Sequence, residues 1–212
     1  MLSASPSAEF ASTLGPAPLV AGVDEAGRGP LAGPVVAAAV LLCKPVPKGM
    51  ADSKKLTAKA RGAAEVLIRR DCAFGIGVVD VEEIDRINIF QATMLAMSLA
   101  MERLCEALGR NDLQTLIDGN LTPAGRCDRW RWDATPIVGG DGIEPAIGAA
   151  SILAKEYRDR LMIEAAQRHP HYGWERNKGY GSKEHMAALR EHGPTPLHRR
   201  SFAPVAQMEM EL

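Results

Sequence analysis

Acidic side chains are the residues of this sequence best suited to chemistry. Asp24 and Glu25 end one apolar run, Asp118 ends another, and Asp159 lies in a partly apolar segment shared with a lysine. Carboxylates that converge raise each other's pKa unless cations neutralise them. Oxygen ligands suit Mg²⁺ or Mn²⁺ rather than zinc, and two such ions about 3.5–4 Å apart assist phosphodiester displacement. The spacing alone leaves this convergence a hypothesis.

Each acid also has a simpler interpretation. Asp24 and Glu25 fit the charged turn of a surface hairpin, because acidic residues are common at strand ends. Asp118 precedes Gly119-Asn120 and fits an Asx-type turn. Asp159 follows Lys155 by four residues and fits a helical ion pair of a few tenths of a kcal/mol.

Hydrophobic patterning predicts the elements that position these acids. Two apolar runs around a Gly/Pro turn predict a β-hairpin in which Asp24 and Glu25 cannot share a face, since side chains alternate along a strand. The remaining predicted elements are a helix from the Thr57 cap through Arg70, a strand Cys72–Val79, a helix Asn88–Leu108, a strand Leu113–Asp118, a weaker strand Pro136–Asp141, a helix Pro145–Arg168 and a short helix from Ser182 to about His192. This order favours a mixed sheet covered by helices.

Composition is that of a globular protein without a global basic field. Hydrophobic residues make up 46%, charged residues 24%, and the net charge is −1. Charge is uneven, because Lys155–Arg200 holds ten Lys/Arg against six Asp/Glu and all five histidines, which predicts a basic face. The four cysteines lack metal-ligand spacing and suit a reducing cytosol. No apolar run is long enough to span a membrane, and residues 1–18 lack the pattern of a signal peptide and predict a disordered leader.

A long motif gives the sequence its clearest resemblance. The segment Val23-Asp24-Glu25-Ala26-Gly27-Arg28-Gly29-Pro30-Leu31-Ala32-Gly33-Pro34-Val35 resembles the opening signature of ribonuclease HII. Further matching segments follow in the family's order: Asp52-Ser53-Lys54-Lys55-Leu56, Glu83-Ile84-Asp85 with Asn88-Ile89, Ile117-Asp118-Gly119-Asn120, Ala149-Ala150-Ser151-Ile152-Leu153-Ala154-Lys155, Arg158-Asp159, Lys178-Gly179-Tyr180 and His198-Arg199-Arg200-Ser201-Phe202. The resemblance covers about Leu19 to Val205, and the first segment alone is highly specific.

The resemblance implies a ribonuclease H-like α/β fold, with a central mixed five-stranded sheet flanked by helices. The catalytic domain would span residues 19–205, with a helical C-terminal portion from about residue 170, after the leader 1–18 and before a tail 206–212. The implied enzyme is a cytoplasmic, monomeric endoribonuclease without a membrane partner. It would hydrolyse RNA in RNA–DNA hybrids and cut 5′ of single ribonucleotides in duplex DNA, using two Mn²⁺ or Mg²⁺ ions and leaving 5′-phosphate and 3′-hydroxyl ends.

The resemblance also assigns roles to individual residues. The four acids Asp24, Glu25, Asp118 and Asp159 would be the catalytic metal ligands. Gly27-Arg28-Gly29 would approach the minor groove, where the 2′-hydroxyl is displayed, and Arg28 would contact a backbone phosphate. Tyr180 would stack on the deoxyribose that follows the ribonucleotide. Lys54 and Lys55, which otherwise fit a solvated turn, would contact phosphates.

Three departures from the family's pattern bear on the substrate. Gly139 stands where the family usually has lysine, Gly148 where serine is common, and Gly181-Ser182 where Pro-Thr usually follows the tyrosine. They affect the expected affinity and junction preference rather than the reaction class. Two alternatives stay open: a ribonuclease H that needs several consecutive ribonucleotides, which the Gly27–Gly29 motif and Tyr180 argue against, and a non-enzymatic nucleic-acid-binding protein, which predicts the loss of an acid.

Overall fold

A single mixed β-sheet organises the protein. The computed structural model describes residues 2–4, 19–42 and 56–211, and in these parts the strand order is β1-β4-β3-β2-β5-β6. The strands are β1 (Ser3–Ala4), β2 (Leu19–Ala26), β3 (Val35–Leu41), β4 (Ala73–Val79), β5 (Leu113–Asp118) and β6 (Asp133–Ile137). β3 pairs antiparallel with β2 and β4, whereas β5 runs parallel to β2 and β6. This confirms the predicted hairpin and the mixed sheet of five strands, β2–β6, to which the two-residue β1 adds a sixth strand beside β4.

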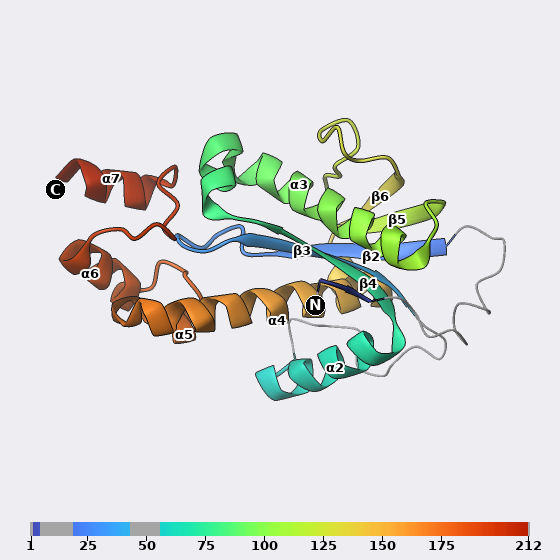
Figure 1. The fold of residues 1–212 in the computed structure, drawn as a ribbon, viewed down its shortest axis with the longest axis horizontal. Helices are drawn as coiled ribbons and strands as arrows, with labels where there is room; N and C mark the ends of the chain where they lie inside the picture. Colours follow the sequence, from blue (N-terminus) through green and yellow to red (C-terminus); the bar gives the residue numbers. More distant parts are fainter. Residues whose placement is uncertain (1, 5–18, 43–55, 212) are drawn as a thin grey trace.

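Helices cover both faces of this sheet. They are α2 (Ala58–Asp71), α3 (Val81–Leu108), α4 (Pro145–Arg168), α5 (Trp174–Asn177), α6 (Lys183–His192) and α7 (Ala203–Glu211), with short 3₁₀ turns η2 (Gly140–Gly142) and η3 (Pro170–Tyr172). α3 lies on one face, and α2 and α4 lie on the other (Figure 1). Side chains of β3 alternate between two cores, because Ala37 packs on the α3 side and Ala38 on the α4 side. None of the helices in the described parts of the chain is long and apolar enough to cross a membrane.

A glycine brings α4 unusually close to the sheet. A Cβ on Gly22 of β2 would collide with the backbone of Ala146 and Ile147 at the start of α4. Pro145 occupies the first turn of α4, where its missing N–H costs no hydrogen bond. The close approach lays α4 along β2, so that the middle of the helix passes the end of the strand that carries Asp24 and Glu25.

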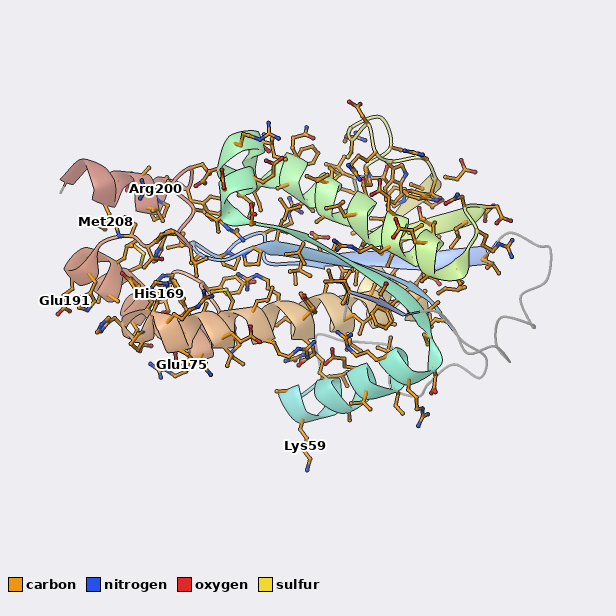
Figure 2. All side chains as sticks on the ribbon, viewed as in Figure 1. Lys59, His169, Glu175, Glu191, Arg200 and Met208 are labelled. Atoms are coloured by element: carbon orange, nitrogen blue, oxygen red, sulfur yellow. The ribbon has the colours of Figure 1, made fainter. Side chains whose placement is uncertain are left out.

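The C-terminal part of the chain gathers at the end of the sheet toward which β2 runs (Figure 1). Its core joins Trp174, Leu189 and Val205 to Leu31 and Ala32 from the β2–β3 connection. Backbone hydrogen bonds tie the same segments, since the Leu31 N–H donates to the Gly179 carbonyl at 2.8 Å and the Arg199 N–H donates to the Leu31 carbonyl at 2.8 Å. Figure 2 shows Glu191 on the outer surface of this part, and Lys59 of α2 pointing away from the sheet.

Four element boundaries differ from the predictions. The long helix predicted from Asn88 begins at Val81 and is interrupted at Asn88, whose φ is 68°. The weak strand predicted over 136–141 lies at 133–137, because β5 pairs with Asp133–Ile137 and a 3₁₀ turn follows. A helix, α7, occupies Ala203–Glu211, so it continues from the predicted domain into residues 206–211, for which no helix was predicted.

The leader is the fourth correction. Ser3–Ala4 pair antiparallel with β4, so these two residues form a strand, where we expected disorder. Residues 5–18 of the predicted leader lie outside the described residues. The other predicted helices agree with the structure. Thr57 accepts from the Ala60 N–H to cap α2, Ser182 caps α6, and α4 has the predicted bounds.

Candidate active site

Strand register brings three of the predicted acids to one edge of the sheet. Asp24 lies opposite Ala38 and Glu25 opposite Ala37, so the two carboxylates leave opposite faces of β2 as expected. Ile117 pairs with Val23 on the parallel neighbour β5, so Asp118 follows directly beside Asp24. Because β2 and β5 are parallel, their carboxyl ends meet at the same edge.

A cavity of about 490 Å³ opens at this edge. The acids on one side and basic or polar side chains on the other share its wall, which is formed by Asp24, Glu25, Ala26, Gly27, Arg28, Gly29, Arg61, Asp118, Ser151, Lys155, Arg158 and Tyr180. The residues come from the end of β2 and its loop, β5, α2, α4 and the segment before α6. The cavity therefore combines carboxylates, cations and an aromatic ring.

Burial and mutual repulsion perturb the acids. The pKa of Asp24 is raised well above its usual value, first by burial and then by the charges of Glu25 and Asp118. The pKa of Glu25 is also raised, mainly by burial, although Arg28 opposes this by donating from Nη1 to Oε1 at 3.3 Å. Two hydrogen bonds partly offset this increase in the pKa of Asp24. One comes from the Glu25 N–H, 2.7 Å from Oδ1, and the other involves Ser151 of α4.

The donor set at this edge fits divalent cations. Among the residues that the structure describes, Asp118 Oδ1 is the one buried side-chain oxygen or nitrogen without a hydrogen-bond partner. An unpaired buried carboxylate oxygen is costly unless a cation binds it. No group of three or more His, Cys, Asp or Glu side chains within the described ranges already has the spacing of a metal site.

Asp159 is not among the residues that form the cavity wall. Its carboxylate lies on α4, is 9% exposed, and accepts from Lys155 Nζ at 2.6 Å. This is the helical ion pair that the sequence also allowed. Another acid, Asp141 in η2, is 4% exposed and lies four residues beyond Ile137, which pairs with Asp118. In the sequence, Asp141 drew attention only because Gly139, two residues before it, stands where the family usually has lysine.

The predicted substrate residues that the structure describes all line the cavity. Gly27, Arg28 and Gly29 form its β2–β3 rim, and Tyr180 forms the facing side with its ring half exposed. A Cβ on Gly29 would lie 3.5 Å from Tyr180 Cε1, so the ring stands next to this rim. Lys54 and Lys55 lie outside the described residues.

Four polar residues of the wall were not predicted from the sequence as site residues, and one of them is Arg158 of α4. Arg61 of α2 reaches the cavity and is held by Glu156, with Nε and Oε1 2.5 Å apart. Ser151 and Lys155 of α4 also line it. Their spacing of four residues places them on one face of a helix, which was the available signal, but no pattern showed that this face points at Asp24.

The sheet topology and the acids at its edge define a ribonuclease H-like enzyme of the α/β class. A profile of the family described as "Ribonuclease HII" matches residues 21–205. A relative named "Ribonuclease HII" from Novosphingobium aromaticivorans is 68% identical over 191 residues, covering 89% of this chain and 97% of the relative. The chain therefore belongs to the ribonuclease HII family, and it is a ribonuclease H.

Solved structures agree with this fold. Ribonuclease H2 from Pyrococcus horikoshii OT3 superposes with a TM-score of 0.66 at 25% identity, covering 91% of this chain and 97% of that one. Bst-RNase HIII in complex with Mn²⁺ superposes with a TM-score of 0.72 at 20% identity, covering 98% of this chain and 74% of that one. The second likeness concerns the fold alone.

Proposed function

We propose that this ribonuclease H, besides hydrolysing RNA in RNA–DNA hybrids, cuts duplex DNA on the 5′ side of a single embedded ribonucleotide. The products would carry 5′-phosphate and 3′-hydroxyl ends. The observation that supports this proposal is a single cavity that joins three carboxylates to the Gly27–Gly29 rim and to Tyr180. Such a cavity can hold one sugar–phosphate unit between the acids and groups that contact its sugar.

Asp24, Glu25 and Asp118 are the proposed ligands for two Mg²⁺ or Mn²⁺ ions. Bound ions of this kind stabilise both the attacking and the leaving oxygen in phosphodiester hydrolysis. The buried, unpaired Asp118 Oδ1 favours a cation at this place, and so do the burial and the repulsion by neighbouring acids that raise the pKa of Asp24. Asp159, the fourth acid of the resemblance, is proposed as a further ligand, which it becomes by exchanging its bond with Lys155 for a cation.

The remaining wall residues would bind and orient the substrate. Backbone groups of Gly27 and Gly29 can approach the minor groove, where the 2′-hydroxyl distinguishes RNA from DNA. Arg28 is half exposed and free to exchange Glu25 for a phosphate. Tyr180 offers its exposed ring to the next sugar. Lys54 and Lys55 are proposed phosphate contacts.

The test uses three substrates: duplex DNA with one ribonucleotide, an RNA–DNA hybrid and an all-DNA duplex. Each is incubated with Mg²⁺, with Mn²⁺ and with EDTA, beside Asp118→Asn. The matched control is Asp112→Asn, since Asp112 is an exposed acid that precedes the same strand and pairs with Arg110 away from the cavity. We expect metal-dependent cleavage 5′ of the ribonucleotide that only Asp118→Asn abolishes.

Two other outcomes would change the proposal. Cleavage of the hybrid without cleavage of the single-ribonucleotide duplex would assign an enzyme that needs consecutive ribonucleotides. Binding of all three substrates without any cleavage would overturn the catalytic assignment of Asp24, Glu25 and Asp118. Mapping the product ends separates 5′ cleavage from cleavage on the other side of the ribonucleotide.

A further inference from the structure

Two arginines are buried behind the Gly27–Gly29 rim. Arg158 of α4 is 1% exposed and Arg199, which follows α6, is 0% exposed. Within the described parts of the chain, neither guanidinium pairs with a carboxylate. A buried charge without a counter-ion is costly and is kept only where polar groups surround it. Burial lowers the pKa of Arg158 to about 10 and of Arg199 to about 9, so both remain charged at neutral pH.

Backbone carbonyls take the place of the missing carboxylates. Arg199 donates to the carbonyl oxygens of Gly27 at 2.6 Å, Arg28 at 3.0 Å and Gly33 at 2.8 Å. Arg158 donates to those of Pro34 at 2.9 Å, Ala32 at 3.0 Å and Lys178 at 2.9 Å. The two guanidiniums thus bind five backbone carbonyls of the β2–β3 loop. Arg158 also binds the carbonyl of Lys178, two residues before Tyr180.

These bonds fix the direction of the peptide units at the rim. In a planar trans peptide the C=O and the following N–H point in opposite directions. Because the carbonyls of Gly27 and Arg28 point inward at Arg199, the N–H groups of Arg28 and Gly29 point away from it. Successive N–H groups held in this way bind anions and other acceptors. The rim therefore offers paired donors to a sugar–phosphate backbone.

We propose that Arg199 and Arg158 are positioning residues, which lock the Gly27-Arg28-Gly29 rim with its N–H groups turned toward the ribonucleotide. This inference rests on the proposed function and deepens it. Neither arginine takes part in the chemistry. Their contribution is pre-organisation, so it affects the binding and discrimination of the embedded ribonucleotide more than the hydrolysis step.

The test is Arg199→Lys, which keeps the charge but loses the planar fork that serves three carbonyls at once. The matched control is Arg160→Lys. Arg160 also lies on α4, two residues after Arg158, but its guanidinium donates hydrogen bonds to Glu65 instead of to the rim. We expect KM for the single-ribonucleotide duplex to rise roughly tenfold, the equivalent of about one lost hydrogen bond. We expect kcat to stay within about twofold. The single-ribonucleotide to hybrid cleavage ratio should fall, and Arg160→Lys should change neither value.

A purely structural role would give a different result. Arg199→Lys would then lower the melting temperature while leaving the KM and the cleavage ratio unchanged, and this would overturn the inference. Failure of the proposed function is separate, because the unmodified enzyme would then not cut the single-ribonucleotide duplex at all.

A second measurement covers the case in which Arg199→Lys does not fold. In the Asp118→Asn background, the backbone amide resonances of Arg28 and Gly29 are followed during titration with single-ribonucleotide duplex and with all-DNA duplex. We expect both resonances to shift more with the ribonucleotide. Equal shifts with the two duplexes, or none, would refute the proposed direction of the rim.

Discussion

Gly27→Ala tests how tightly the rim is held, because two separate costs meet at this position. Gly27 has a φ of 97°, which L side chains rarely adopt, and its Cβ would collide with Arg158 and lie 2.8 Å from the Pro34 carbonyl oxygen. Backbone strain of this kind costs about 1–2 kcal/mol, and overpacking adds about 1–3 kcal/mol. We therefore expect Gly27→Ala to lower the free energy of unfolding by roughly 2–5 kcal/mol in urea denaturation.

Two other glycines separate these costs. Gly119 has nearly the same φ, 99°, but a Cβ there would meet nothing within 4 Å, so Gly119→Ala should lose only about 1–2 kcal/mol. Gly29 has no positive φ and leaves ordinary contact distance to Tyr180, so Gly29→Ala should stay within about 0.5 kcal/mol. Equal destabilisation by Gly27→Ala and Gly119→Ala would show that Arg158 does not fill the space beside Gly27.

The remaining predictions concern the acids and a buried histidine. Asp118→Asn should reduce cleavage by more than about 10²-fold without lowering the free energy of unfolding, because it removes a charge that repels Asp24; a less stable variant would contradict this. Asp159→Asn should also reduce cleavage, because its carboxylate can exchange Lys155 for a cation; full activity in steady-state assays would remove Asp159 from the proposed ligands. Burial, then His185, lower the pKa of His198 to about 3. The unfolded chain therefore takes up this proton first, near pH 6.5, and stability falls by at most about 1.4 kcal/mol per unit as the pH drops from there toward 3. In urea denaturation at a series of pH values, His198→Gln should show a smaller fall in the free energy of unfolding over this pH range.

Elements with local signals were predicted well. The helix Pro145–Arg168 has a proline at its start and His169-Pro170 at its end, and the structure gives the same bounds. The first hairpin follows from two apolar runs and a Gly/Pro turn. Both signals are contained in neighbouring residues, so no knowledge of distant parts of the chain was needed.

Elements that depend on distant partners were predicted less well. The predicted strand 136–141 included Val138, which is 74% exposed, whereas pairing with β5 selects residues 133–137 despite their exposed pattern. The α3 boundary shows a different limit. Asn88 does cap a helix, because its Oδ1 accepts from the N–H groups of Phe90 and Gln91. A first helical segment, which Asp80 caps through the Glu83 N–H, precedes it, and the Asp80–Glu83 spacing was the overlooked signal.

The candidate site likewise contains some residues whose positions could be predicted from the sequence and others whose positions could not. Acids at strand ends could be predicted to share an edge, since parallel neighbours end together. Whether Asp159 points to that edge depends on the rotation of α4, which is set by packing of Gly22 against Ala146 rather than by any motif. The sequence shows the residue types of Asp159 and Arg61, but tertiary packing sets the direction of their side chains. Only the structure can therefore show whether such residues belong to the site.

The buried arginines extend this reasoning to the rim itself. Arg199 recognises carbonyl oxygens, which every residue carries, so no pattern of side chains in the sequence could show its partners. The two ends of the interaction, Gly27 and Arg199, are 172 residues apart in the sequence. The shape of the rim therefore depends on docking of the C-terminal part against the β2–β3 loop, whereas the positions of Asp24, Glu25 and Asp118 depend on the sheet alone. It follows that the proposed groups for hydrolysis and the proposed groups for recognising the ribonucleotide are assembled by different parts of the chain. We therefore expect substitutions behind the rim to alter selectivity without touching an acid.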